Sequence, residues 1–330
     1  MSYLRHIHAI DTHTECDPTR LVLSGIPSIK GNTMAEKRDN FIKNYDHIRK
    51  FLIHEPRGHK DMFGALITEP SDDSCLFGMI FMDADGYLDL CGHGIIAGVS
   101  VGFKTGMIPL DAASSPINVD TPAGLVKAFP RIEDNELQDV EIEAVESFCY
   151  KTGYQVKVED GKTIPVDIAY GGNFFAFAQS SDIGIDVKKE NLTELTRVAM
   201  TIKKEINENL DLIMPDGSKK VLDLVEIVDK PSMPEAKCKN ILVYGDGQVG
   251  RDPCATGLCA KMAIEHHKGN LKENEDYVYE GILGTVYRGR IKEVTESGNA
   301  IVPIIAGRTF IVGFLNFVLE SGDPLSDWLL

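Results

Sequence analysis

One short pattern occurs twice in this chain, and it constrains the fold more than any other feature of the sequence. Cys91 begins the run CGHG and Cys254 begins the run CATG, and each run leads into a stretch with the composition of a helix. In each copy a glycine stands 15 positions after the cysteine, at Gly106 and Gly269, where glycine commonly caps a helix C-terminus. The repeat therefore predicts two related lobes, each with a cysteine at the N-terminus of a helix.

The rest of the sequence predicts a mixture of strands and helices. Short runs rich in Val, Ile and Phe, such as FGMIFMD and NILVYG, are bounded by Gly, Asp or Pro and indicate strands. Residues 37–53 and 191–210 carry apolar residues at helical spacing, and we expect both helices to pack on the outside of sheets. Because strands and helices do not alternate regularly, the pattern favours an α+β fold. The small apolar residues after Cys91 suit a helix buried inside a wrapped sheet.

The length of the chain also argues for two lobes. A chain of 330 residues is longer than one simple core normally needs. We expect the first lobe to span residues 1–125 and to be completed by a C-terminal segment near residues 310–330. The second lobe is then expected to span residues 126–309.

Charge and hydropathy narrow the possible partners. The formal net charge of -16 gives no attraction to nucleic acid or to anionic lipid. No apolar run approaches the roughly 18 residues of a membrane span, and the N-terminal residues lack a signal-peptide pattern. The 7 cysteines form an odd, scattered set that does not indicate a disulfide framework. We therefore expect a cytoplasmic protein that binds neither nucleic acid nor membrane.

The position of the two repeated cysteines suggests a reaction. The partial positive charge at a helix N-terminus lowers the pKa of a cysteine there, and the free N–H groups bind carboxylates. Two such helix ends facing each other would hold a small carboxylate between Cys91 and Cys254. One thiolate would remove the α-proton from one face while the other thiol protonates the opposite face. This arrangement would invert a stereocentre without a cofactor.

Three other interpretations of these residues stay open. A single cysteine before a helix is often a packing residue, which is the role we expect for the other five cysteines. Zinc ligation is another possibility for Cys91, His93, Cys254 and Cys259. Their spacing does not match a zinc knuckle and Cys259 is expected inside the helix, so we expect no metal. A cysteine hydrolase would need a His and an acid paired with one thiol, and the sequence contains no identifiable pattern of that kind.

Several longer blocks resemble a known enzyme family. The blocks MDADGYLDLCGHGII and GDGQVGRDPCATG resemble the two catalytic blocks of the proline racemases and 4-hydroxyproline epimerases, and AIDTHTE, AYGGNFFA and LVEIVD also match in the family's order. The resemblance covers nearly the whole chain and is close to the clostridial-type proline racemases. It implies a diaminopimelate-epimerase-like fold, in which two similar lobes each curl a sheet around a central helix and the site lies between them. It also implies a homodimer that binds a small-molecule imino acid and uses no cofactor or metal.

The resemblance implies roles for individual residues. Cys91 and Cys254 match the two catalytic thiols. The residues that match the two substrate-binding turns are Gly92, His93 and Gly94, and Ala255, Thr256 and Gly257. Phe63 matches an aromatic wall of proline-specific members, and Tyr244 matches a position that is Phe in proline racemases and often His in hydroxyproline epimerases. The trans-3-hydroxyproline dehydratases of the family lack the second cysteine, so Cys254 argues against that branch.

The sequence departs from the family pattern at positions that bear on the substrate. The second block normally reads Asp-Arg-Ser-Pro-Cys-Gly-Thr-Gly. Here Gly250 replaces the Asp that meets the substrate ammonium, and Asp252 stands two positions later. Either Asp252 binds the substrate in its place or the anchor is missing, and we favour the missing anchor. In addition, Cys16 and Asp17 replace the usual Gly and Glu, and Ile95 replaces a Thr.

These observations leave one leading hypothesis and two alternatives for function. The leading hypothesis is cofactor-independent racemisation of proline by one thiolate base and one thiol acid. A 4-hydroxyproline 2-epimerase is the alternative within the same class, because Tyr244 would be able to donate a hydrogen bond to a ring hydroxyl. A diverged member that binds imino acids with little or no catalysis is the alternative from another class, because Gly250 replaces the family's Asp.

Overall fold

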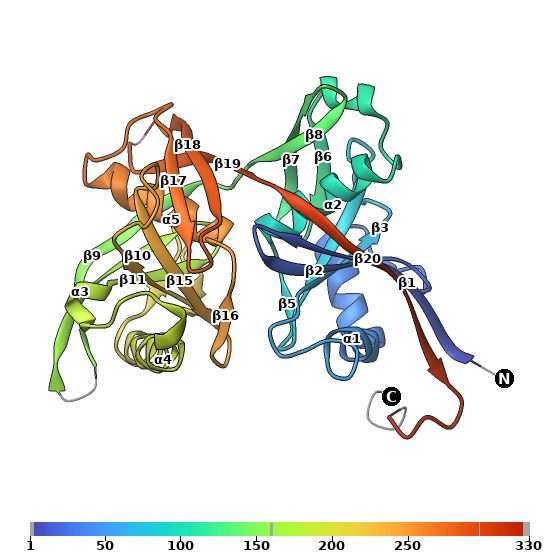
Figure 1. Ribbon diagram of the computed structural model, residues 1–330, viewed down its shortest axis with the longest axis horizontal. Helices are drawn as coiled ribbons and strands as arrows, with labels where there is room; N and C mark the ends of the chain where they lie inside the picture. The colour runs from blue at the N-terminus through green and yellow to red at the C-terminus, as the bar shows by residue number, and fades with distance from the viewer. Residues whose placement is uncertain (1–2, 159–160, 297, 326–330) are drawn as a thin grey trace. The chain divides into compact units, whose positions relative to one another are not determined.

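The computed structural model describes residues 3–158, 161–296 and 298–325. Contacts between residues divide the chain into two units, which can be followed by colour in Figure 1. Unit 1 comprises Met1–Ile142 and Gly307–Leu330, and unit 2 comprises Glu143–Ala306. The C-terminal segment therefore returns to the unit that the N-terminal residues build.

Unit 1 is a sheet wrapped around helix α2 (Gly92–Lys104). Its other elements are β1 (Tyr3–Thr14), β2 (Asp17–Ser24), α1 (Met34–Ile53), β3 (Gly64–Thr68), β4 (Phe77–Met82), β5 (Tyr87–Leu88), η1 (Leu110–Ser114), β6 (Ile117–Thr121), β7 (Gly124–Glu133), β8 (Glu136–Glu143) and β20 (Thr309–Glu320). Strands pair in the order β20, β1, β2, β3, β4, β6 and β7, and the short β5 also pairs with β4. The strand β20 from the end of the chain thus lies beside β1 from its beginning.

Helix α2 is buried because its residues are small and apolar. Every residue from Gly94 to Phe103 is buried, and the helix contacts strands β1, β2, β3, β7 and β20. Two of its glycines permit close packing, since a side chain at Gly94 would lie 3.1 Å from Phe81 and one at Gly98 would lie 3.0 Å from Met79. The expectation that the first helix lies inside a wrapped sheet is confirmed.

Unit 2 repeats this plan with a sheet that closes on itself. Its elements are β9 (Ser147–Lys157), β10 (Thr163–Tyr170), β11 (Phe174–Gln179), α3 (Ser180–Ile183), η3 (Lys189–Asn191), α4 (Leu192–Asn209), β12 (Leu212–Ile213), β13 (Lys219–Lys220), β14 (Leu224–Asp229), β15 (Cys238–Tyr244), β16 (Gln248–Gly250), α5 (Ala255–His267), β17 (Tyr277–Gly281), β18 (Val286–Val294) and β19 (Ala300–Gly307). Strands pair in the order β9, β10, β11, β14, β15, β17, β18 and β19, and β19 pairs back with β9. The short β16 pairs with β15.

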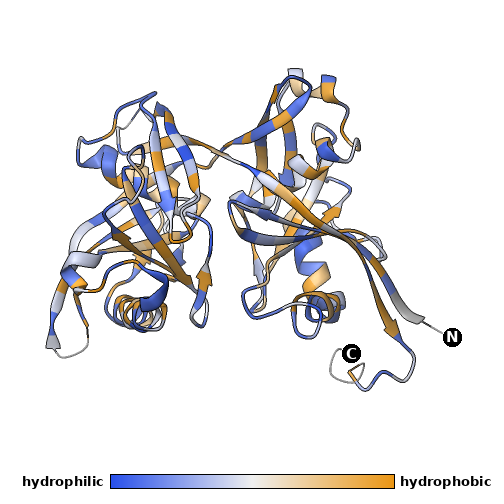
Figure 2. Ribbon diagram, in the orientation of Figure 1, coloured by the Kyte–Doolittle hydropathy of each residue, from blue (hydrophilic) through white to orange (hydrophobic). Residues whose placement is uncertain are grey.

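The two long helices of unit 2 differ in their surroundings. Helix α5 contacts β9, β10, β11 and β18 and is buried from Gly257 to Ile264. Helix α4 buries one apolar stripe, which includes Leu195, Ile202 and Ile206, and most of its other residues are hydrophilic (Figure 2). An amphipathic helix of this kind covers the outside of a sheet, whereas α5 is enclosed by one.

The structure confirms the main expectations about secondary structure. Residues 37–53 lie in α1, and residues 192–209 form α4. Gly106 and Gly269 each follow a helix end, with φ angles of +75° and +76° that favour glycine. Each unit curls a sheet around a central helix, so the α+β fold with two similar lobes is confirmed. Among the residues described, no helix is both long enough and apolar enough to cross a membrane.

Candidate active site

Cys91 stands at the N-terminus of α2, as the sequence predicts. It is the N-cap residue and has an extended backbone, with a φ angle of -144°. The first intrahelical hydrogen bond runs from the Ile95 N–H to the Cys91 carbonyl, at 3.1 Å. The N–H groups of Gly92, His93 and Gly94 come before that bond and point out of the helix end. A buried thiol and a set of backbone donors are therefore placed together.

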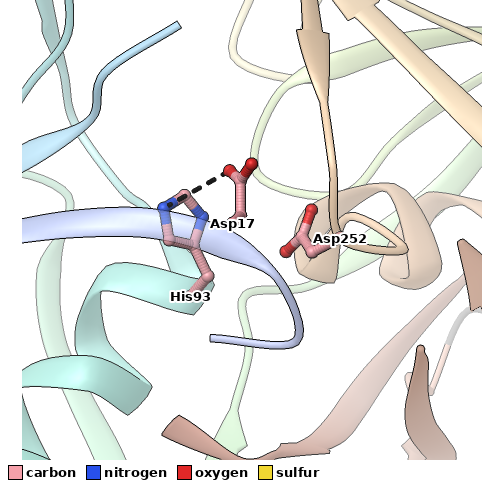
Figure 3. Close-up of side chains that lie close together, drawn as sticks. All are labelled: Asp17, His93 and Asp252. Atoms are coloured by element: carbon pink, nitrogen blue, oxygen red, sulfur yellow. Dashed lines mark ion pairs between the residues drawn. The ribbon is translucent and has the colours of Figure 1, made fainter. Parts of the chain in front are cut away.

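The imidazole of His93 lies directly beside this thiol. Cys91 Sγ is 3.2 Å from His93 Nδ1. On the other side of the ring, His93 Nε2 is 3.8 Å from Asp17 Oδ2 (Figure 3). Burial lowers the pKa of His93, and the charge of Asp17 opposes that shift. The Phe63 ring packs edge-on against the imidazole, with 4.5 Å between ring centroids. A neutral imidazole in this position is able to accept the thiol proton.

Asp17 follows a tight turn between β1 and β2 and was not among the residues predicted for the site. Glu15 and Cys16 have φ angles of 45° and 84°. Glu15 is buried, and its Oε1 accepts hydrogen bonds from the backbone N–H and the Nε of Arg308. The turn places Asp17 at the start of β2, next to His93. The family's Gly at the position of Cys16 was a signal for this turn, because a backbone with a positive φ angle favours glycine.

Cys254 occupies the equivalent position at the N-terminus of α5, but its environment differs. Its φ angle is 63°, in the left-handed region. Its sulfur accepts a hydrogen bond from the Gly257 N–H at 3.3 Å and lies 3.8 Å from Thr256 Oγ1. Ala255, Thr256 and Gly257 form the first turn of the helix. The predicted residues of the second block are thus assembled around the second thiol.

Asp252 supports the backbone that leads into Cys254. Its Oδ1 accepts a hydrogen bond from the Cys254 N–H at 3.0 Å, and its Oδ2 accepts one from the Tyr287 hydroxyl at 2.7 Å. The residue is 2% exposed. Gly250 ends β16, where a side chain would lie 3.1 Å from Leu242. Asp252 therefore stabilises the turn, and its predicted contact with a substrate stays a prediction.

A buried carboxyl group beside Cys254 was not predicted from the sequence. Glu226, in the middle of β14, is fully buried and accepts a hydrogen bond from the Tyr279 hydroxyl. Burial raises the pKa of Glu226 to about 8. Burial, and then the charges of Glu226 and Asp252, raise the pKa of the Cys254 thiol well above its ordinary value. The sequence did contain a signal for this group, because Glu226 interrupts the apolar run LVEIVD, where a buried acidic residue needs a specific partner.

The remaining predicted residues and cysteines can be placed individually. Tyr244 ends β15, and its carbonyl accepts a hydrogen bond from the Gly247 N–H at 3.0 Å. All seven cysteines are free thiols. Burial raises the pKa of Cys149 and of Cys238 to about 11, and Cys259 is buried within α5. These three thiols are protonated at neutral pH and suit packing roles.

The chain is similar to known proteins over nearly its whole length. The family model described as proline racemase matches residues 9–329. The proline racemase of Acetoanaerobium sticklandii is 44% identical over 329 residues, which cover 98% of each chain. The proline racemase of Clostridioides difficile is 42% identical over 328 residues, again 98% of each chain. The crystal structure of a hydroxyproline epimerase from Agrobacterium vitis, with bound trans-4-hydroxy-L-proline, has a TM-score of 0.87 and 26% identity, covering 98% of this chain and 95% of that one.

Proposed function

The chain belongs to the proline racemase family, and we propose that it interconverts the two enantiomers of proline without a cofactor. The observation that carries this proposal is the pair of buried cysteines, Cys91 and Cys254, each at the N-terminus of an enclosed helix. Each thiol is accompanied by backbone N–H donors of the kind that bind a carboxylate. The two units correspond in this proposal to the two catalytic lobes.

The proposed reaction needs one base and one acid on opposite faces of the same carbon. A thiolate takes the α-proton, so that the C–H bond breaks and an S–H bond forms. The other thiol gives its proton to the opposite face, so that its S–H bond breaks and a new C–H bond forms. The planar, negatively charged state in between is stabilised by the helix N-termini that bind the substrate carboxylate. In the reverse direction Cys91 and Cys254 exchange roles.

Individual residues have distinct tasks in this proposal. Gly92, His93 and Gly94 bind one side of the carboxylate, and the turn of Ala255, Thr256 and Gly257 binds the other. Phe63 lies against the His93 ring, where an apolar wall suits a ring without a hydroxyl group. The cysteine hydrolase alternative is weaker, because it gives no role to a second cysteine with the same placement.

Epimerisation of 4-hydroxyproline is the second candidate function. It is favoured by the bound ligand of the Agrobacterium vitis structure and by Tyr244, whose hydroxyl is a group that can donate a hydrogen bond to a ring hydroxyl. A weakly active imino-acid binder is the third, because Gly250 supplies no carboxylate and Asp252 is engaged by Cys254 and Tyr287. Loss of one charge-assisted hydrogen bond to the substrate ammonium would weaken binding by about 1.5–3 kcal/mol.

One assay separates these functions. The protein is incubated in heavy water with L-proline and, separately, with trans-4-hydroxy-L-proline. Optical rotation and the α-proton signal are followed together. Loss of rotation with α-deuteration of proline alone supports the racemase, and inversion of hydroxyproline alone supports the epimerase. Binding of a pyrrole carboxylate, with neither substrate exchanging its α-proton, would overturn both enzymatic proposals.

We further propose that the protein acts as a homodimer in the cytoplasm. The dimer is proposed from the family resemblance, and the cytoplasm from the seven free cysteines, which suit a reducing compartment. Sedimentation equilibrium at several protein concentrations measures the dimer directly. A particle mass equal to one chain of 36.3 kDa at all concentrations would contradict the dimer.

A further inference from the structure

Glu226 lies directly beneath the first turn of α5. It is in the middle of β14 and has no exposed surface. A side chain added at Gly257 would overlap Glu226 Oε1 and would lie 3.1 Å from Cys254 Sγ. The missing side chain of Gly257 therefore leaves the space in which the carboxyl group approaches the sulfur.

The two oxygens of this carboxyl group have different environments. Oε2 accepts the hydroxyl hydrogen of Tyr279 from β17. Oε1 is buried and, among the described residues, has no hydrogen bond of regular geometry. The Cys254 thiol lies close enough to interact with the carboxyl group. A buried oxygen without a regular partner is costly, and the S–H group is the donor placed to satisfy it.

No positive charge near Glu226 and Cys254, among the residues described, is paired with the Glu226 carboxyl group. Lys261 is buried in α5 and attracts Glu226, but its Nζ pairs with Glu265 at 2.7 Å. Cys238 and Tyr277 are the further titratable groups near the carboxyl group. On the side of the sulfur, Asp252 adds a second negative charge, while the Gly257 N–H and the Thr256 hydroxyl favour a thiolate. Two carboxyl groups therefore act on one thiol.

We propose that Glu226 is a positioning residue for Cys254. Its carboxyl group faces the sulfur and keeps it in the thiol form that donates a proton. This inference rests on the proposed function, because it assigns a resting state to one of the two proposed catalytic thiols. Cys91 has an imidazole as its neighbour instead. The free enzyme would therefore rest with Cys254 as the acid.

The test is the pH profile of alkylation at Cys254. The full-length protein is treated with short pulses of iodoacetamide between pH 7 and pH 10.5, and modification of the Cys254 and Cys91 peptides is quantified by mass spectrometry. Glu226→Gln lacks the negative charge that the carboxyl group gains as the pH rises above about 8. We therefore expect the midpoint for Cys254 to fall by about one pH unit, roughly a tenfold faster modification at a fixed pH below the midpoint. The profile of Cys91 should stay within about twofold of the wild type.

Two further variants separate this role from a general loss of structure. Glu280→Gln is the matched control, because Glu280 is an equally buried glutamate of unit 2 whose carboxylate accepts hydrogen bonds from Ser232 and Met233. It should leave the Cys254 midpoint unchanged. Tyr279→Phe removes the hydrogen bond to Oε2 and should shift the midpoint in the same direction as Glu226→Gln, by less. If Glu226→Gln does not fold, the Cys254 midpoint of Tyr279→Phe is the measurement that tests the proposal.

The outcomes are decisive because the midpoint reports the protonation of the thiol, whereas access of iodoacetamide to the sulfur changes the limiting rate of modification. An unchanged or raised Cys254 midpoint in a folded Glu226→Gln protein overturns the proposal, as does an equal shift in Glu280→Gln. Alkylation requires no turnover. Failure of the protein to racemise proline would therefore refute the proposed function and leave this test intact.

Discussion

The first turns of α2 and α5 share a sequence pattern but place their cysteines in different electrostatic settings. Cys91 has an extended backbone and a neighbouring imidazole. Cys254 has a left-handed backbone, a sulfur that accepts the Gly257 N–H, and two carboxyl groups close by. A repeated motif therefore reproduces the helix start but not the chemistry of its thiol. The residue at the third position of the motif differs, His93 against Thr256, and Glu226 approaches Cys254 from strand β14.

The largest effect should come from removing either thiol. If the two turns form one catalytic pair, Cys91→Ser and Cys254→Ser should each lower the rate of proline inversion by about 10³-fold or more, since each direction needs one acid and one base. Polarimetry measures the rate. Cys149→Ser, which alters a half-buried free thiol of β9, should retain activity. Full racemisation by either single variant would show that the two cysteines do not act as a pair.

The glycines of the two turns provide a second comparison. A methyl group at Gly257 overlaps Glu226, whereas one at Gly94 lies 3.1 Å from Phe81 and 3.2 Å from Phe63. We expect Gly257→Ala to destabilise the protein by about 1–3 kcal/mol and to cost more stability than Gly94→Ala. Urea unfolding followed by circular dichroism gives both values. The packing argument is wrong if the two substitutions cost the same.

The pH dependence of stability should reveal Glu226 independently of activity. Its pKa is raised to about 8 in the folded protein, from an ordinary value of 4.5. The folded state then binds more protons than the unfolded state between these values, so stability falls as pH rises from about 5 to about 8. Glu226→Gln has no carboxyl group to ionise and does not lose stability in this way. The Tm of this variant minus the Tm of the wild type should therefore increase by several degrees between about pH 5 and about pH 8.

The matched control for that experiment is again Glu280. Hydrogen bonds from Ser232 and Met233 and the charge of Lys239 lower the pKa of Glu280. Its contribution is complete above the ordinary pKa of a glutamate and is lost only on acidification. The Tm of Glu280→Gln relative to wild type should therefore stay constant between pH 5 and pH 8. A constant difference for Glu226→Gln as well would show that its carboxyl group is not held neutral by burial.

The smallest effect concerns the turn that places Asp17. Cys16 has a φ angle of 84°, which an L-residue rarely adopts. Cys16→Gly should stabilise the protein by about 0.5–1 kcal/mol, measured as a shift in the midpoint of urea unfolding. Cys254 also has a positive φ angle, but there the thiol has a proposed role and glycine would remove it. Destabilisation by Cys16→Gly would mean that the Cys16 side chain contributes packing that outweighs the strain.

Local features of the chain were predictable from sequence because short-range interactions determine them. The helix starts at Cys91 and Cys254 and the left-handed glycines at Gly106 and Gly269 follow from backbone preferences within a few residues. Burial of α2 followed from its small apolar composition. The blocks around both cysteines also indicated the family, because their residues are adjacent in the chain.

The environment of each thiol was decided by the tertiary structure. Glu226 reaches Cys254 from β14, and Tyr279 reaches Glu226 from β17, because the pairing of strands around α5 brings these segments together. Asp17 reaches His93 in the same way, through the turn between β1 and β2. The pKa of a buried group depends on desolvation and on charges a few ångströms away. Desolvation and the distances to nearby charges do not follow from the spacing of residues along the chain. Two similar sequence motifs therefore place their thiols next to different groups.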